Sequence, residues 1–158
     1  MKFSGCLLAL SIFSGMQAAQ HQAHALAQKF ITLVGEQYGE ELSMSIEFEA
    51  ALDALYSDDY TEISNFKVIA SSKVYFKEHL KKTNCIYGFW KVTDVGYIPD
   101  NSDTNRCEIV FRWWTEKKGV FDIKANMQSS SDGMYIKSIK KTVVQVCKVG
   151  DFSQIKNE

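Results

Sequence analysis

The sequence predicts one α+β domain, with helices in its first half and an antiparallel sheet after them. Apolar residues recur at helical spacing in three segments before residue 83, and they alternate with polar residues along four segments from residue 87 onward. A length of 158 residues, 46% of them hydrophobic and 23% charged, is typical of one globular domain. No repeat and no Pro- or Gly-rich linker divides the chain.

Residues 1–19 are interpreted as a signal peptide. Lys2 is the only charged residue before Lys29, and Gly5–Met16 is an apolar run that is too short to span a bilayer. We therefore expect export to the periplasm or the exterior, without a stable membrane anchor. The domain is expected over residues 20–149, and a flexible tail over residues 150–158. The alternative is that the apolar run forms an N-terminal helix of the mature fold.

Three helices and one interrupted strand are expected between this leader and residue 82. Apolar side chains line one face of each helix, as Leu26, Phe30 and Val34 do in the first. Ser71 or Ser72 is suited to cap the third helix. The predicted helices cover Gln22–Tyr38, Phe48–Tyr56 and Lys73–Lys82, and the strand, interrupted at Ser64–Asn65, covers Tyr60–Ala70.

Four long strands are expected in the second half of the chain. Glu116–Lys118 followed by a glycine is typical of a three-residue hairpin loop whose glycine is left-handed. In that register Trp113 faces Phe121 on one side of the hairpin, and Arg112 faces Asp122 on the other. One face is therefore predicted to be buried and the other wet. The strands are expected at Tyr87–Ile98, Arg106–Thr115, Gly119–Gln128 and Met134–Val146.

Lysines interrupt the alternation of the last strand, at Lys137, Lys140 and Lys141. A bulge near Lys140–Lys141 restores the pattern. That bulge turns inward the side chains of Ile139, Thr142, Val144 and Val146. The other alternative is a lysine that faces a solvated pocket.

Three cysteines remain once Cys6 has left with the leader, so at most one internal disulfide can form. The predicted topology permits only Cys85 with Cys147, but about 14 Å separates the two positions across a flat sheet. Free thiols are therefore favoured, and Cys107 is expected to be buried. The wide spacing of the cysteines does not fit a zinc site.

Five short stretches resemble the nuclear transport factor 2-like superfamily, which includes the SnoaL-like proteins. They are Leu55–Tyr60, Asn65–Phe66, Phe76–Leu80, Gly88–Val92 and Trp114–Gly119. The resemblance spans residues 25 to 147. It implies a cone-shaped α+β fold, with three N-terminal helices packed against a strongly bent antiparallel sheet and a pocket at the open end. It also implies a homodimer through the outer sheet face, and either ligand binding or isomerase, dehydratase or cyclase activity.

His79 and Asp94 are the candidate catalytic residues if the protein is an enzyme. An imidazole can transfer protons near neutral pH. Asp94 is suited to act as a base if its strand face points into an aromatic cavity. The alternatives are a helix residue at the core margin for His79 and a solvated carboxylate for Asp94. The candidate pocket residues are Tyr38, Tyr75, His79, Trp90, Asp94, Trp113 and Phe121.

The functional interpretation that the sequence favours is an exported, non-enzymatic module that binds a small apolar ligand or a protein partner. A formal charge of −1 gives no reason to expect nucleic acid as a partner. No motif predicts a metal or a cofactor. The alternative is an acid–base enzyme of the isomerase, dehydratase or cyclase kind, and a structural or secretion-apparatus component is the third interpretation.

Overall fold

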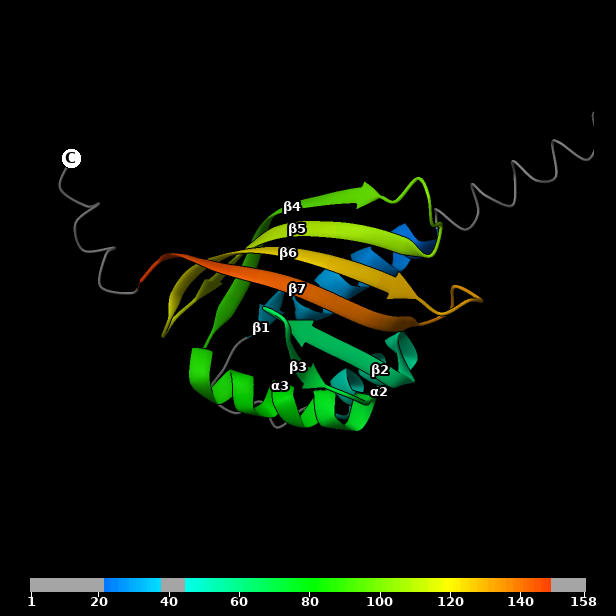
Figure 1. Ribbon diagram of the computed structural model, residues 1–158. Helices are drawn as coiled ribbons and strands as arrows, with labels where there is room; N and C mark the ends of the chain where they lie inside the picture. The colour runs from blue at the N-terminus through cyan, green and yellow to red at the C-terminus, as the bar shows by residue number, and fades with distance from the viewer. Residues whose placement is uncertain (1–21, 38–44, 149–158) are drawn as a thin grey trace, which may run out of the picture.

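The computed structural model describes residues 22–37 and 45–148, and over these residues the chain is an α+β domain. Helices pack against one face of a sheet whose described strands run in the order β1-β4-β5-β6-β7-β2-β3 (Figure 1). The predicted leader and tail, and Tyr38 at the end of the first predicted helix, lie outside the described residues. The third helix does not belong to an uninterrupted N-terminal group, because three strands precede it.

The first helix covers residues 22–34 and buries Ala23, Leu26, Ala27 and Phe30, which lie three to four positions apart. It is shorter than predicted, because the chain turns at Gly35 into the short strand β1 (Glu36–Gln37). The Gly35 carbonyl accepts a hydrogen bond from the Val92 N–H at 2.6 Å, which ties this turn to strand β4.

Helix α2 covers Ile46–Leu55, and helix α3 covers Lys73–Tyr87. The Ser45 hydroxyl caps α2 by accepting a hydrogen bond from the Phe48 N–H at 3.1 Å. Ser72 does the same for α3, accepting from the Tyr75 N–H at 3.4 Å, so it is the second of the two predicted capping serines. Helix α3 runs five residues beyond the predicted end at Lys82, and the following strand begins later in consequence.

The segment predicted as one interrupted strand is a hairpin. It consists of β2 (Tyr56–Ser64) and β3 (Lys67–Ala70), joined by a two-residue turn. Asn65 and Phe66 form that turn with φ angles of 46° and 66°, both left-handed. The Asn65 side chain stabilises the turn by hydrogen bonding to the N–H and C=O of Val143, at 2.8 and 3.2 Å. Because neither turn residue is a glycine, the sequence gives little sign of the reversal.

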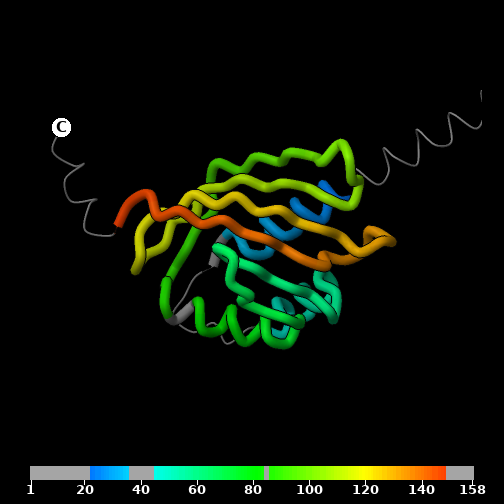
Figure 2. Tube along the Cα trace, viewed as in Figure 1, coloured from blue at the N-terminus to red at the C-terminus, as the bar shows by residue number. Residues whose placement is uncertain are grey.

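Four long strands form an antiparallel meander, which is easily followed along the chain trace (Figure 2). The predicted hairpin is confirmed. Trp113 pairs with Phe121, Arg112 pairs with Asp122, and the glycine after the loop has φ of 98°. The strands are β4 (Trp90–Pro99), β5 (Arg106–Thr115), β6 (Gly119–Ser129) and β7 (Ile136–Cys147).

Strand β7 is regular at Lys140–Lys141, so the predicted bulge there is wrong. Lys140 pairs with Asn126 and Lys141 pairs with Ala125 in unbroken register. Lys141 therefore points to the helical side, and Thr142, Val144 and Val146 are exposed. The sheet is also not purely antiparallel, because β7 pairs with β2 in parallel. Such neighbours require a long crossover, which α3 and four strands supply here.

The core lies between the helices and the inner face of the sheet. Its fully buried side chains include Leu52, Tyr56, Tyr60, Ile109 and Met127. Cys107 is buried as predicted, and burial raises the pKa of its thiol above the usual value. The Cys85 side chain lies outside the described residues, so the expectation of free thiols at Cys85 and Cys147 stays a prediction. No described helix is long and apolar enough to cross a membrane.

Candidate functional site

A cavity of about 80 Å³ lies between the first helix, α3 and the inner sheet face. Its walls are mainly apolar, and its polar groups come from β2, α3 and β7. The apolar lining residues are Phe30, Val34, Phe76, Leu80, Trp90, Val92, Phe111, Trp113 and Ile123, and the polar ones are Glu62, His79, Thr83 and Lys141.

Two tryptophans fix the shape of one wall. The Trp90 indole N–H donates a hydrogen bond to the Val34 carbonyl at 2.9 Å, at the end of the first helix. Its ring lies 5.8 Å from that of Trp113, at an interplanar angle of 76°. Trp113 also packs against Tyr87 at 4.6 Å and Phe121 at 5.5 Å. These edge-to-face and tilted contacts make the wall a rigid aromatic surface.

Glu62 and Lys141 form an ion pair at the polar end of the cavity. The Lys141 Nζ lies 2.7 Å from Glu62 Oε1, and only 3% of the Glu62 side chain is exposed. The Tyr60 hydroxyl donates to Glu62 Oε2 at 3.0 Å. The carboxylate thus receives a donor on each oxygen, which offsets the free energy of removing its charge from water.

The aromatic cluster behind Glu62 contains Tyr56, Tyr60 and Phe76, whose ring centroids lie 4.6–4.9 Å apart. Burial raises the pKa of both tyrosines well above the usual value, and the nearby Glu62 charge adds to the effect. Both phenols are therefore neutral at physiological pH. The Tyr56 hydroxyl is buried and has no hydrogen-bond partner among the described residues.

His79 lines the cavity from helix α3. Burial lowers the pKa of His79 below its usual value; the Glu62 charge opposes this shift, and Lys141 and Lys82 add to it. The ring is therefore mainly neutral at pH 7. The Thr83 hydroxyl donates to the His79 carbonyl at 2.9 Å and lies 3.2 Å from His79 Nε2. With its one proton directed at that carbonyl, the Thr83 oxygen is able to accept from Nε2–H, and in that tautomer Nδ1 is the unprotonated nitrogen.

The structure brings three of the predicted pocket residues together: His79, Trp90 and Trp113. Phe121 supports Trp113 from behind and does not line the cavity. Tyr75 is 65% exposed and lies outside it. Tyr38 lies outside the described residues.

Asp94 does not face the cavity. It has φ of 53° at an irregularity between Thr93 and Gly96, which turns its side chain to the outer sheet face. There it is 71% exposed and lies 3.9 Å from the Arg112 guanidinium. Asp94 and His79 therefore do not meet in one pocket, and the carboxylate in the pocket is Glu62.

Glu62 and Lys141 are not among the pocket residues predicted from the sequence. Lys141 gave a signal, because it breaks the alternation of its strand, and the lysine facing a pocket was the alternative to a bulge. Glu62 gave a weaker sequence signal. It follows the buried Tyr60 by two positions, so it shares the inward face of β2.

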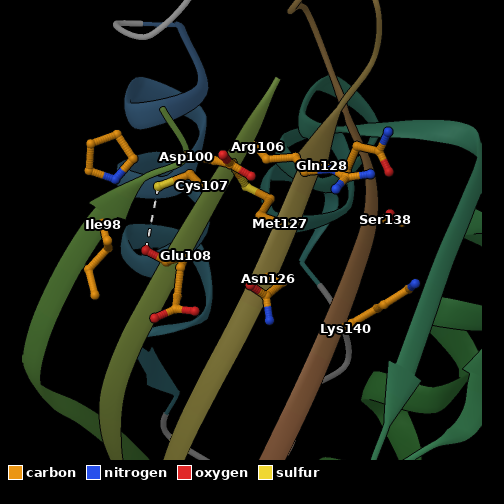
Figure 3. A pocket seen from close by; sticks show the side chains of 11 residues that line it. Ile98, Asp100, Arg106, Cys107, Glu108, Asn126, Met127, Gln128, Ser138 and Lys140 are labelled. Carbon is orange, nitrogen blue, oxygen red and sulfur yellow. Dashed lines mark hydrogen bonds between the residues drawn. The ribbon is translucent and has the colours of Figure 1, made fainter. Parts of the chain in front are cut away.

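A second, polar hollow of about 400 Å³ lies on the outer sheet face (Figure 3). Glu108, Asn126 and Lys140 project into it from adjacent strands, and Arg106 and Gln128 lie toward its end. The Cys107 thiol, drawn beside it, donates to the Glu108 carbonyl at 3.6 Å. No three His, Cys, Asp or Glu side chains gather as metal ligands within the described part of the chain.

Solved structures share the fold of this chain. No family model matches the sequence, and no curated protein matches it. A phenazine biosynthesis-related protein from Pseudomonas aeruginosa aligns with a TM-score of 0.64 and 11% identity, over 91% of this chain and 89% of that one.

Two further solved structures show the same architecture. A protein from Agrobacterium tumefaciens, inferred to be an isomerase of the SnoaL-like family, aligns with a TM-score of 0.61 and 9% identity, over 78% of this chain and 98% of its own. A nuclear transport factor 2-like protein of unknown function from Exiguobacterium aligns with a TM-score of 0.58 and 15% identity, over 75% of this chain and 98% of its own. The chain therefore has the nuclear transport factor 2-like fold, as the sequence motifs indicated.

Proposed function

We propose that this protein binds a small, mainly apolar molecule in the cavity between the helices and the sheet. The observation that carries the proposal is the lining itself, nine apolar side chains with a few polar groups at one end. Such a surface is typical of ligand sites. Fold alone does not choose an activity, so the proposal rests on the cavity and not on the relatives.

Filling the cavity tests the proposal. Val92 lines it, so Val92→Phe should occupy the space and abolish binding of a small aromatic probe such as toluene, followed by tryptophan fluorescence. Val144→Phe is the matched control, because Val144 is 58% exposed on the outer face. Both variants need a thermal melt to show that they remain folded. Equal toluene binding by the two variants, or none by the unmodified protein, would contradict the proposal.

An acid–base enzyme is the second candidate, because Glu62 and His79 line the same cavity. In this version His79 Nδ1 removes a proton from the carbon beside a ketone, and the proton returns to the same or a neighbouring carbon. Incorporation of deuterium from solvent into acetophenone, measured by NMR, tests it. Loss of the exchange in His79→Gln supports the enzyme, and exchange at the rate of buffer alone rejects it.

We also propose that the module acts after export, as a homodimer joined through the outer sheet face. Support for this surface comes from its exposed apolar side chains, Trp114, Val144 and Val146 at 40–58% exposure. Light scattering after size-exclusion chromatography should give twice the chain mass. Val144→Lys should give the mass of one chain. A monomeric unmodified protein would contradict the proposed homodimer.

A further inference from the structure

We infer that the cavity selects an uncharged ligand of no more than one ring that carries a hydrogen-bond-accepting oxygen, such as an alcohol, a phenol or a ketone. This inference rests on the proposed ligand binding. It names the chemical class of the ligand from three properties of the cavity: the donors that remain unused at its polar end, its net charge and its size.

The unused donors belong to Lys141. Its ammonium group has three N–H bonds, and one of them is directed at Glu62. No described residue accepts a hydrogen bond from the other two. Thr83 engages His79 Nε2, and both oxygens of Glu62 already have donors. No described side chain therefore accepts from the remaining Lys141 donors, and a ligand oxygen can do so.

The net charge excludes ions. The Glu62 and Lys141 charges cancel, and a lowered pKa keeps His79 neutral above pH 7. A ligand carboxylate would add an uncompensated negative charge, and an ammonium group an uncompensated positive one. Either charge is costly against walls that are mainly apolar. A neutral oxygen satisfies the Lys141 donors without that penalty.

The size excludes larger molecules. An apolar cavity of about 150 Å³ accommodates benzene. At about 80 Å³ this cavity, which opens to solvent, is smaller than that, so a single ring already fills it and extends into the opening, and a second ring cannot be buried. One ring, or a short branched chain, is therefore the upper limit for the buried part of the ligand.

Four molecules of the same skeleton test the inference: toluene, benzyl alcohol, benzoate and benzylamine. Their dissociation constants are measured on the full chain at pH 8, where His79 is neutral, by NMR titration and tryptophan fluorescence. Benzyl alcohol should bind at least as tightly as toluene. Benzoate and benzylamine should bind at least tenfold more weakly than benzyl alcohol.

A charge-neutral double variant, Glu62→Gln with Lys141→Met, tests the role of the polar end. The double variant should weaken the binding of benzyl alcohol at least tenfold more than that of toluene, because the charged donor is lost. Lys140→Met is the matched control. Lys140 directly precedes Lys141 and is exposed on the outer face, so its loss should leave the ratio of the two dissociation constants unchanged. If the double variant does not fold, the four ligands still test charge selection on the unmodified protein.

The outcomes separate this inference from the proposed function. Equal affinity for all four molecules, or tight benzoate binding at pH 8, overturns the inference and leaves ligand binding intact. An unchanged alcohol-to-toluene ratio in a folded double variant overturns the role of Lys141. Failure of both toluene and benzyl alcohol to bind overturns the inference together with the proposed function.

Discussion

The buried ion pair makes a sharp prediction about stability. Lys141→Met removes one partner and leaves the Glu62 carboxylate 3% exposed, with only the Tyr60 hydroxyl as a donor. Loss of one partner of a buried pair costs about 3–5 kcal/mol. The Lys141 side chain is 23% exposed, so we expect the lower end, about 3 kcal/mol. In a domain of this size that loss lowers Tm by about 10 °C.

Two companion variants separate the unpaired charge from the lost packing. Glu62→Gln with Lys141→Met removes both charges, and the amide oxygen still accepts from Tyr60, so its stability should lie within about 1 kcal/mol of the unmodified protein. Lys140→Met on the exposed face should change stability by less than about 0.5 kcal/mol. Urea melts with a common slope measure all three. If the single and double variants lose the same stability, the carboxylate is not held by Lys141 and the description of the polar end is wrong.

Four further predictions concern other parts of the chain. Phe111→Ala should cost about 3–5 kcal/mol in denaturant melts, because its ring is 7% exposed and packs on the core. Arg112→Ala, on the wet face, should cost much less, and equal losses would mean that the two faces are assigned wrongly. NMR titration should give His79 a pKa below its usual value. The unfolded chain then binds more protons, so the stability that the neutral ring contributes is lost as pH falls from the usual histidine pKa through the lower folded one, and His79→Gln should flatten this dependence. N-terminal sequencing of protein recovered outside the cytoplasm should give a first residue between 19 and 26, whereas recovery of intact Met1 from the cytoplasm would reject the signal peptide. Thiol reagents should label Cys107 only after unfolding, since rapid labelling of the native thiol contradicts its burial.

The fold was predictable where the determining interactions are local. The β5–β6 hairpin follows from a short loop, its glycine and complementary pairs a few residues away on each side, such as Arg112 with Asp122 at 2.8 Å. The β2–β3 hairpin has an equally tight turn, yet its first turn residue, Asn65, is held by hydrogen bonds to Val143, which is remote in sequence. Those contacts are not visible in the sequence, which therefore predicts an interrupted strand where the structure has a hairpin.

The same contrast explains which part of the candidate site was found. Trp90 and Trp113 lie on adjacent strands and face the core by simple alternation, so strand patterning suffices to place them. Alternation fails for Asp94, because it is left-handed and lies at an irregularity of β4, which turns its side chain to the outer face. It also fails for the Glu62–Lys141 pair, whose partners meet only because β2 and β7 are parallel neighbours.

Parallel pairing between strands this distant in sequence gives no local signal, whereas a lysine in an otherwise apolar face does. A lysine at such a position requires either a backbone irregularity that turns it outward or a buried acceptor that compensates its charge. Strand β7 has no irregularity at Lys141, so an acceptor had to exist on a neighbouring element, and Glu62 is that acceptor. A charged residue that breaks a strand pattern therefore indicates a polar site inside the fold, even when its partner cannot be identified from the sequence. In this chain the broken pattern marked the polar end of the cavity more directly than the histidine and aspartate that general acid–base chemistry suggested.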